Sequence, residues 1–252
     1  MTDPPTPGVY YSATGKKTFV PLENNPAVFT SLIHHLGVSP ALTFHDIYSL
    51  TDPALLSLVP RPTHALIFIS PSKVYHRVRS HDADGKELRD AGSGPDENVM
   101  WFKQTIGNAC GLIALLHAVA NGSAREFVKA GSALEGILQA AEPLKPVERA
   151  RLLYDSVALE RAHMAVAVQG DTVAPIAAEH VGYHFICFVK GRDGHLWELE
   201  GGWEGPIDRG VLREGEDVLS ERALEAGVRR YVRAAEGNVD FSVVALAGEM
   251  EE

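Results

Sequence analysis

The sequence predicts an α+β fold in which helices flank a central antiparallel sheet. One indication is a strongly apolar helix, expected to start near Cys110 and to end at Asn121-Gly122, which are residue types common at helix ends. Another is a β-hairpin, because the strand-like segments 184–189 and 195–200 flank the turn-forming residues 190–194. A chain of 252 residues that is 45% hydrophobic can bury a sizeable core around these elements.

The remaining elements follow from apolar patterning and from turn-forming residues. The proline-rich N-terminus is not a signal peptide, and we expect a disordered segment 1–17 followed by one domain, 18–252. The polar, glycine-containing stretch 80–98 is expected to be a surface loop. We expect helices over 26–36, 123–141, 146–163 and 219–235, strands over 43–49, 64–70 and 239–247, and turns over 201–210.

Cys110 is the candidate nucleophile. It stands at the expected N-terminus of the apolar helix, where the helix dipole favours thiolate over thiol. Gln104, six residues earlier, can turn back and offer its side-chain N–H to an oxyanion, beside the backbone N–H of Cys110. This arrangement is typical of a cysteine hydrolase of the papain-like type. The other cysteine, Cys187, lies in a buried strand three residues after His184, so we expect a packed core thiol facing the other side of the sheet.

A nucleophilic thiol needs a base, and the chain has 11 histidines. His117 follows the cysteine by two helical turns, about 10 Å along the axis, which is too far to hydrogen-bond the sulfur. His184 opens the first strand of the hairpin. If Lys190 pairs with Gly194, His184 lies directly opposite Glu200, whose carboxylate then fixes the imidazole tautomer and favours the imidazolium. Three other histidines have no carboxylate in a suggestive place: His34, His35 and His45.

These motifs together resemble the ubiquitin C-terminal hydrolase family of deubiquitinating cysteine proteases, in its small single-domain form. The resemblance runs from about residue 18 to residue 247. Its most specific parts are the cysteine motif Lys103-Gln-Thr-Ile-Gly-Asn-Ala-Cys-Gly-Leu-Ile113 and the hairpin motifs His184-Phe-Ile186 and Gly194-His-Leu-Trp-Glu-Leu-Glu-Gly201. Further matches are Val20-Pro-Leu-Glu-Asn-Asn-Pro26, Leu58-Val-Pro-Arg-Pro62 before the apolar run 65–69, and Pro146-Val-Glu-Arg-Ala150.

The resemblance implies a papain-like core and a thiol mechanism. Cys110 is the expected nucleophile, His184 the general base and acid, Gln104 the oxyanion donor, and Glu200 the orienting acid. The family usually has aspartate at the last position, inside Glu-Leu-Asp-Gly, whereas this chain has Glu200. Glutamate orients the base in other hydrolases, and Glu198 is farther from the pairing row of the histidine.

Substrate contacts are also implied by the resemblance. The segment 163–178 is expected to cross over the active site and to exclude folded leaving groups, in keeping with the functional role of long loops inside domains. The expected substrate-binding residues are Leu22, Asn108, Val168 and Ala174.

The expected function is hydrolysis of small adducts, peptides or unfolded extensions from the C-terminal glycine of ubiquitin through an acyl-enzyme. This chemistry needs neither a cofactor nor a metal. Alternative functions remain. A ubiquitin-binding protein with weak hydrolysis would share every motif, and a peptidase for a ubiquitin-like modifier is closely related to the expected function. An acyltransferase with the same Cys-His-acid geometry would need an acceptor or cofactor pocket that the sequence does not reveal.

The charge balance bears on partners. A net charge of −10 argues against nucleic acid and suits a basic partner such as ubiquitin. No apolar run is long enough for a membrane span, and only two cysteines are present, which suggests a reducing compartment. We therefore expect a cytoplasmic monomer, with the nucleus as a second compartment that the sequence leaves open.

Overall fold

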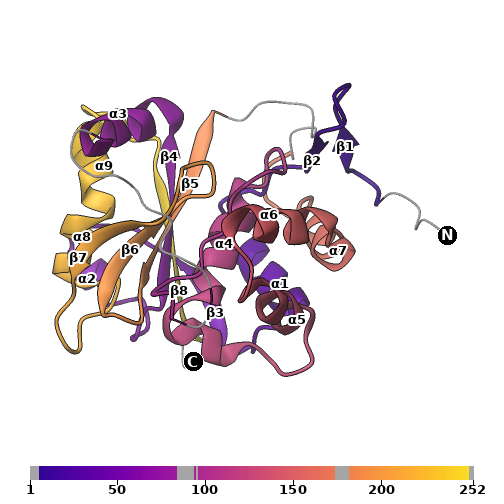
Figure 1. The fold of residues 1–252 in the computed structure, drawn as a ribbon. Coiled ribbons are helices and arrows are strands. Elements are labelled where there is room, and N and C mark those ends of the chain that lie inside the picture. Colours follow the sequence, from indigo (N-terminus) through magenta and orange to yellow (C-terminus); the bar gives the residue numbers. More distant parts are fainter. Residues whose placement is uncertain (1–5, 84–93, 95, 174–181, 250–252) are drawn as a thin grey trace.

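Helices pack on both faces of a six-stranded antiparallel sheet (Figure 1). The computed structural model describes residues 6–83, 94, 96–173 and 182–249. The strand order is β3-β8-β4-β5-β6-β7, so the chain's last strand lies between β3 and β4. The strands are β3 (Leu42–Asp46), β4 (Ala65–Pro71), β5 (Tyr183–Lys190), β6 (His195–Leu199), β7 (Ile207–Val211) and β8 (Ser242–Gly248). The antiparallel sheet with flanking helices confirms the expected fold class.

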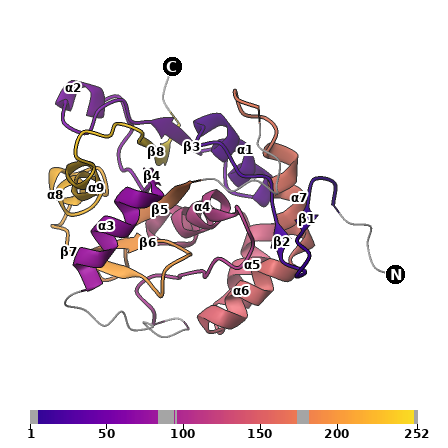
Figure 2. The same ribbon diagram turned by 90° about the horizontal axis from the view of Figure 1, so that it is seen from above.

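Side-chain alternation along the central strands divides the core into two parts. On one face, Phe185 and Cys187 of β5 pack toward α1 (Pro26–Leu36) and α4 (Cys110–Ala120). On the other face, Ile186 and Phe188 pack toward the C-terminal helices. The first face also carries α5 (Ala133–Ala141), α6 (Pro146–Asp155) and α7 (Val157–Val166), and the second carries α3 (Ser72–Ala83), α8 (Glu221–Ala226) and α9 (Val228–Ala234) (Figure 2).

Helix α1 has the expected bounds because both of its ends are specified locally. The Asn25 side chain accepts a hydrogen bond from the backbone N–H of Ala27, and Pro26 occupies the first turn. Gly37 then ends the helix with a φ of 103°, a left-handed conformation that glycine adopts without a steric penalty.

Several expected helices are divided in the structure, and some of the observed elements were not expected. The region 123–141 contains a 3₁₀ helix (Gly122–Phe127) and then α5, while 146–163 contains α6 and α7 with a break at Ser156. The region 219–235 breaks at Gly227 into α8 and α9. Helix α3 covers the start of the expected surface loop 80–98, of which 84–93 and 95 lie outside the described residues. The short helix α2 (Pro53–Leu56) and strand β7 were not expected.

The N-terminal region contains a two-stranded sheet, β1 (Tyr10–Tyr11) and β2 (Lys17–Thr18). The expectation of disorder is therefore wrong for residues 6–17, while 1–5 lie outside the described residues. Strand β2 is joined to the chain near the cysteine, since Gly107 N donates to Lys17 O at 2.9 Å and Phe19 N donates to Gly107 O at 3.0 Å.

The hairpin β5–β6 forms, but its register differs from the expected one by two residues. Lys190 pairs with Leu196 rather than with Gly194, and Cys187 pairs with Leu199. The loop closes at Gly191, whose N–H donates to His195 O at 2.8 Å, and Gly194 has a φ of 78°. This three-residue loop with a left-handed glycine is a common hairpin connection, and it sets the register.

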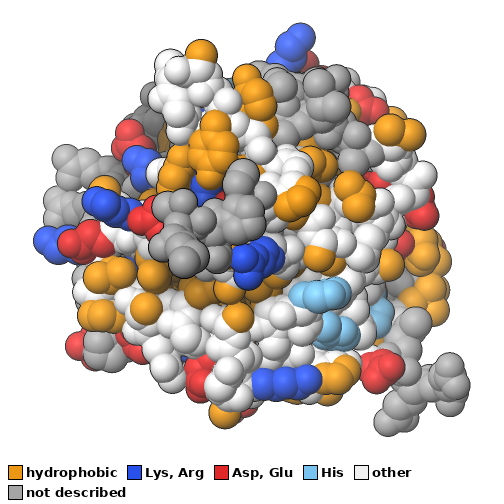
Figure 3. Space-filling view, turned by 90° about the vertical axis from the view of Figure 1, so that its right-hand side faces the viewer, with side chains coloured by type: hydrophobic (Ala, Val, Ile, Leu, Met, Phe, Trp, Pro, Cys, Tyr) orange, Lys and Arg blue, Asp and Glu red, His pale blue; other side chains and the backbone are white. Residues whose placement is uncertain are grey.

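The surface that carries β1, β2, α6 and α7 is chemically mixed. Figure 3 shows Lys and Arg side chains scattered among hydrophobic, acidic and polar ones on this side of the molecule. Among the helices of the described residues, none combines the length and apolar composition that crossing a bilayer requires.

Candidate active site

A cleft of about 850 Å³ contains all four residues that the sequence suggested for catalysis. Cys110 begins α4 and Gln104 lies in the chain before it, while His184 lies on β5 and Glu200 directly follows β6. Cys110 and His184 are 74 residues apart in sequence (184 − 110), so the fold itself brings these groups together. Other lining residues come from the N-terminal hairpin and from the segment after α7: Tyr10, Ser12, Lys16, Thr18, Ala167, Gly170 and Thr172.

Cys110 is the first residue of α4, as expected. Ala109 occupies the N-cap position with φ −91° and ψ 13°, and no side chain caps the helix. The first N–H groups of the helix therefore remain available to an anion in the cleft. Asn108 adopts a φ of 55°, a left-handed conformation that is costly for a residue with a side chain and that often marks functional sites.

The resting thiol does not match the expected thiolate. Burial, together with the negative charge of Glu200, raises the pKa of Cys110 to about 11. The backbone N–H groups of Gly111, Cys110 and Phe185 favour the thiolate but do not outweigh these effects.

Gln104 is held at both its backbone and its side chain. Its backbone N–H donates to Gly201 O at 2.8 Å, and its side-chain Nε2 donates to Ile106 O at 3.1 Å. Gly201 must be small here, since a Cβ would lie 2.6 Å from Ile113 Cγ2 and 3.0 Å from Gln104 Cβ. This close approach fastens the chain after Glu200 directly to Gln104.

His184 and Glu200 come together, although not as directly opposed partners. His184 Nδ1 lies 3.5 Å from Glu200 Oε1. One step beyond the Cys187–Leu199 pair, the observed register would set Glu200 against Ile186, so Glu200 and His184 are diagonal neighbours on one face. Diagonal neighbours are about 7 Å apart, a gap that the longer glutamate side chain helps to span.

The Glu200 carboxylate is buried and well supplied with donors. Its Oε2 accepts from Tyr75 Oη at 2.8 Å, and its Oε1 accepts from the Gly202 N–H at 2.9 Å. Burial alone would raise the pKa of this carboxyl, but His184, Gly202 and Tyr75 outweigh it and hold the pKa below its usual value. Glu200 is therefore ionised at neutral pH.

The thiol and the imidazole are not yet hydrogen-bonded. Within the described part of the chain, no hydrogen bond joins Cys110 Sγ to His184. The two side chains nevertheless face the same cleft. Hydrogen bonds between catalytic groups are often long in unliganded enzymes and tighten when substrate binds.

Glu198 has a different environment from Glu200. It is fully buried, and its carboxylate contacts Arg79 and Arg209, each at 2.6 Å, as well as the Tyr231 hydroxyl. Arg79 and Arg209 offset the cost of burial and keep the pKa of Glu198 low. This carboxylate is fully engaged away from His184, in agreement with the expectation that Glu198 does not substitute for Glu200.

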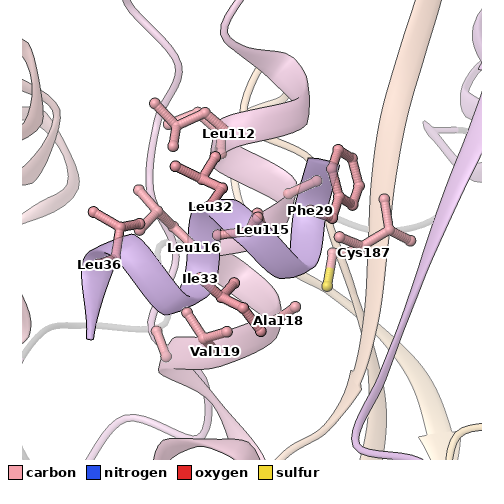
Figure 4. Close-up of a cluster of buried hydrophobic side chains, with 14 of the residues drawn as sticks. Phe29, Leu32, Ile33, Leu36, Leu112, Leu115, Leu116, Ala118, Val119 and Cys187 are labelled. Carbon is pink, nitrogen blue, oxygen red and sulfur yellow. The ribbon is translucent and has the colours of Figure 1, made fainter. Parts of the chain in front are cut away.

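The other cysteine and the competing histidines lie in structural positions. Cys187 is fully buried among side chains of α1 and α4, and burial raises the pKa of its thiol (Figure 4). His117 Nε2 accepts from the backbone N–H of Phe102 at 2.9 Å, and burial lowers its pKa to about 3. His34, His35 and His45 contact backbone carbonyls of Leu42, Ser31 and Gly248.

The expected substrate-binding residues have mixed placements. Leu22 and Asn108 line the cleft. Val168 is 71% exposed, and it is not among the described residues that line the cleft. Ala174 lies outside the described residues. The segment 163–178 also differs from expectation at its start, because α7 continues to Val166.

Sequence reasoning missed three groups at the site. Tyr75 contacts both His184 and Glu200, the hairpin β1–β2 forms one wall of the cleft, and Glu23 binds the start of the segment after α7. The apolar spacing of Val74, Tyr75 and Val78 was an available signal for an amphipathic helix after the strand at 64–70. No local signal marked the β1–β2 hairpin, and the matched segment Val20–Pro26, which contains Glu23, gave no sign of this contact.

Comparisons with known proteins identify the family of this chain. A family profile for ubiquitin carboxyl-terminal hydrolase, family 1, matches residues 19–233. A ubiquitin carboxyl-terminal hydrolase of Aplysia californica is 35% identical over 217 residues, covering 86% of this chain and 96% of the relative. The human isozyme L1 is 35% identical over 226 residues, covering 90% of this chain and 96% of that protein.

The fold is also shared with a solved structure. The catalytic domain of Trichinella spiralis UCH37, crystallised with ubiquitin vinyl methyl ester, superimposes with a TM-score of 0.69 at 22% identity. The match covers 92% of this chain and 95% of that domain. On the strength of the profile match and the curated relatives, this chain belongs to the ubiquitin carboxyl-terminal hydrolase family 1.

Proposed function

We propose that this protein is a thiol-dependent hydrolase that removes small adducts, peptides or unfolded extensions from the C-terminal glycine of ubiquitin. The observation that carries the proposal is the meeting of Cys110, Gln104, His184 and Glu200 in one cleft. Membership of the family supports the substrate, as does the ubiquitin vinyl methyl ester bound to the UCH37 catalytic domain.

In the proposed mechanism, Cys110 Sγ attacks the carbonyl carbon of the ubiquitin C-terminal glycine. His184 accepts the thiol proton and later donates it to the leaving amine. Gln104 Nε2 and the Cys110 N–H donate to the oxyanion, and Glu200 holds the imidazole in the correct tautomer. A water molecule, activated by His184, then releases ubiquitin from the thioester.

The raised pKa of Cys110 adds a detail to the first step. Since the resting thiol is protonated, we infer that proton transfer to His184 accompanies or shortly precedes attack. Substrate binding would bring the sulfur and the imidazole into hydrogen-bonding distance. The ionised Glu200 then stabilises the imidazolium that forms, which lowers the energy of this transfer.

The substrate side of the proposal rests on the walls of the cleft. We assign contacts with the ubiquitin tail to Leu22 and Asn108, which line it, and retain Val168 and Ala174 as predicted contacts. We assign the crossover role to the segment 163–178. Its described portion approaches the cleft through Ala167, Gly170 and Thr172, which supports a restriction on the size of the leaving group.

A second candidate is a ubiquitin-binding protein with weak hydrolysis. The raised pKa of Cys110, and the lack of a described hydrogen bond between Cys110 and His184, favour it. Turnover of a fluorogenic ubiquitin amide separates the two candidates, because the binder would release little dye per protein. Rates with ubiquitin and with ubiquitin-like modifiers, measured side by side, decide between modifier classes.

The domain boundaries, the oligomeric state and the compartment belong to the same proposal. We propose that residues 18–252 act as one catalytic domain of a monomer, in the cytoplasm or the nucleus. The net charge of −10 supports a protein partner over nucleic acid, and electrostatic attraction would speed the approach of a basic one. Size-exclusion chromatography with and without ubiquitin tests the monomer and the complex.

The decisive experiment uses ubiquitin that carries a C-terminal electrophile. One covalent adduct per chain, mapped to Cys110, is the expected result. Cys110→Ala should abolish the adduct and turnover while it retains ubiquitin binding, because one sulfur is a small part of the contact surface. Cys187→Ala is the matched control and should react normally, since Cys187 is fully buried. An adduct on Cys187, or a stable but inactive Cys187→Ala variant, would reverse the assignment of the two thiols.

A further inference from the structure

Tyr75, in the first turns of α3, contacts both the base and the acid of the proposed site. Its ring stacks on the His184 imidazole, with centroids 4.3 Å apart and planes inclined by 18°. Its hydroxyl donates to Glu200 Oε2 at 2.8 Å. Tyr75 is itself buried and is not among the described residues that line the cleft, so it contacts His184 and Glu200 from the side away from the cleft.

The contacts of Tyr75 bear directly on the glutamate at the acid position. A glutamate has one more rotatable bond than an aspartate, so its carboxylate has more freedom to turn away from the imidazole. In this chain both carboxylate oxygens are held, Oε2 by the Tyr75 hydroxyl and Oε1 by the Gly202 N–H. With both oxygens held, Oε1 is directed at His184 Nδ1.

The Tyr75 hydroxyl remains a donor over the whole working pH range. Burial and the negative charge of Glu200 raise the pKa of the phenol far above its usual value. The phenol therefore stays protonated, and it can give its hydrogen to the carboxylate. Because the acceptor is charged, this bond is stronger than one between two neutral groups.

The ring of Tyr75 is fixed by its neighbours. The Arg79 guanidinium, one helical turn later, lies 5.2 Å from the ring centroid, and Arg79 is tied to Glu198 at 2.6 Å. The Tyr231 ring lies nearly parallel to the Tyr75 ring, with centroids 6.5 Å apart and planes inclined by 8°. A ring held in this way can set the plane of the imidazole that stacks on it.

We propose that Tyr75 is a positioning residue for the proposed hydrolase, and that it adapts the site to glutamate at the acid position. Its hydroxyl directs the Glu200 carboxylate at His184, and its ring sets the orientation of the imidazole. The proposal rests on the proposed function for its effect on turnover. It makes no claim that Tyr75 touches substrate.

The test compares Tyr75→Phe with Tyr231→Phe. Tyr75→Phe keeps the stacked ring and removes the hydroxyl that supports Glu200, so kcat should fall about tenfold with little change in KM. Tyr231→Phe is the matched control, because it also removes a buried tyrosine hydroxyl, but that hydroxyl contacts Glu198. It should lower the melting temperature without a comparable loss of kcat.

A double-mutant cycle separates positioning from a general structural role. The shorter acid in Glu200→Asp is withdrawn from Tyr75, so adding Tyr75→Phe to that variant should cost less than twofold in kcat. An equal loss in both backgrounds would overturn the proposal. So would full activity of Tyr75→Phe, or an equal kcat loss in Tyr231→Phe.

A ubiquitin-free measurement keeps this test separate from the proposed function. The His184 Nδ1–H that faces Glu200 Oε1 gives an imidazole proton resonance in NMR, and its exchange with water reports how firmly the carboxylate holds the ring without ubiquitin. Tyr75→Phe should speed this exchange at neutral pH relative to the parent and to Tyr231→Phe. If the parent does not hydrolyse ubiquitin adducts, the proposed function fails, but this comparison still decides the role of Tyr75. Equal exchange rates for the three proteins would overturn it.

Discussion

At the scale of single residues, burial governs the chemistry of the cleft. Desolvation raises the pKa of Cys110 to about 11, whereas donors to Glu200 overcome the same effect and keep that carboxyl ionised. The difference lies in the neighbouring charge, because Glu200 has His184 beside it in addition to its hydrogen bonds, whereas Cys110 faces the negative charge of Glu200. A site of this kind has little reactive thiolate before substrate binds and depends on precise placement of its base.

Gln104 is the residue whose contribution should appear mainly in kcat. Gln104→Ala removes the side-chain donor but keeps the backbone bond to Gly201, so the local fold should survive. Loss of one oxyanion donor should lower kcat on the order of 10²–10³-fold, with a smaller change in KM. Steady-state kinetics with a fluorogenic ubiquitin amide measures both constants. An unchanged kcat would make Gln104 a purely structural residue.

Activity should depend more on the charge of residue 200 than on the length of its side chain. Glu200→Gln keeps the shape but removes the charge that supports the imidazolium, so kcat should fall strongly. Glu200→Asp keeps the charge at a greater distance and should retain more activity than Glu200→Gln. The comparison is made at saturating substrate with the same fluorogenic amide. The opposite order would show that another acid orients His184, although Glu198 is already engaged by Arg79 and Arg209.

At the scale of elements, a buried ion pair joins the N-terminal hairpin to α7. Lys17 Nζ lies 2.8 Å from Glu160 Oε2 on α7, and it also donates to Tyr154 O at 2.7 Å. Both charged side chains are largely buried, with exposures of 9% and 8%. A partner left alone in such a place is costly, because its charge stays buried without compensation.

Lys17→Met should therefore destabilise the protein by about 3 kcal/mol, measured by denaturant unfolding. The double variant Lys17→Met/Glu160→Leu should recover much of this loss, since it removes both charges. Equal losses in the single and double variants would show that the ion pair itself contributes little and that other contacts hold the hairpin.

The same pair gives a pH dependence of known sign. Hydrogen bonds from Lys17 and Thr6, together with the charge of Lys17, outweigh burial and hold the pKa of Glu160 below its usual value of 4.5. The stabilisation is therefore fully present above pH 4.5 and is lost as pH falls through the lower folded pKa. Unfolding free energies measured from pH 6 downward should show a smaller acid loss in Lys17→Met than in the parent. Parallel curves would contradict this.

These elements also show which features a sequence can specify. Helix α1 was predictable because Asn25, Pro26 and Gly37 act locally. The existence of the β5–β6 hairpin was equally local, but its register was not, because it depends on the loop conformation at Gly194. The hairpin β1–β2 was missed because its contacts with Tyr154 lie 137 residues away in sequence.

The candidate site divides in the same way. Cys110, Gln104, His184 and Glu200 belong to short motifs whose residue types and spacing indicate their chemistry. Tyr75 belongs to no motif, and its bond to Glu200 spans 125 residues. Likewise, the expectation of a thiolate used the helix dipole, which sequence reveals, and could not include the burial of the sulfur, which only the fold determines.

At the scale of the whole molecule, Glu23 ties the N-terminal region to the segment that follows α7. Its carboxylate accepts hydrogen bonds from the Thr172 N–H at 2.9 Å and from the Asp171 N–H at 3.3 Å. Asn25 Nδ2 adds a bond to Asp171 Oδ2 at 3.0 Å. These bonds fix the beginning of the expected crossover segment beside the cleft, so Glu23 should influence how large a leaving group the enzyme accepts.

The final prediction concerns that size limit. The parent should release small amines and short peptides from ubiquitin quickly, and should cleave ubiquitin joined to a stably folded domain slowly. Glu23→Ala removes the attachment of Asp171 and Thr172, so the rate with folded adducts should rise relative to the small-amide rate. A flexible Gly/Ser insertion beside Gly170 should act in the same direction at modest entropic cost, because loop-closure entropy grows slowly with length. The quantity to compare is the ratio of kcat/KM for Lys-linked diubiquitin to that for the small amide.

A ratio cancels any general loss of activity, which matters because Glu23 itself lines the cleft. Glu135→Ala is the matched control. Glu135 is an acid on α5, and its carboxylate also accepts a hydrogen bond from a backbone N–H, that of Gly131. Its ratio should equal that of the parent. If the parent already cleaves folded adducts as fast as small ones, the segment 163–178 does not limit substrate size. If the ratio stays constant in both Glu23→Ala and the insertion variant, the limit lies elsewhere in the cleft, and the hairpin wall formed by Tyr10, Ser12 and Lys16 becomes the next element to alter.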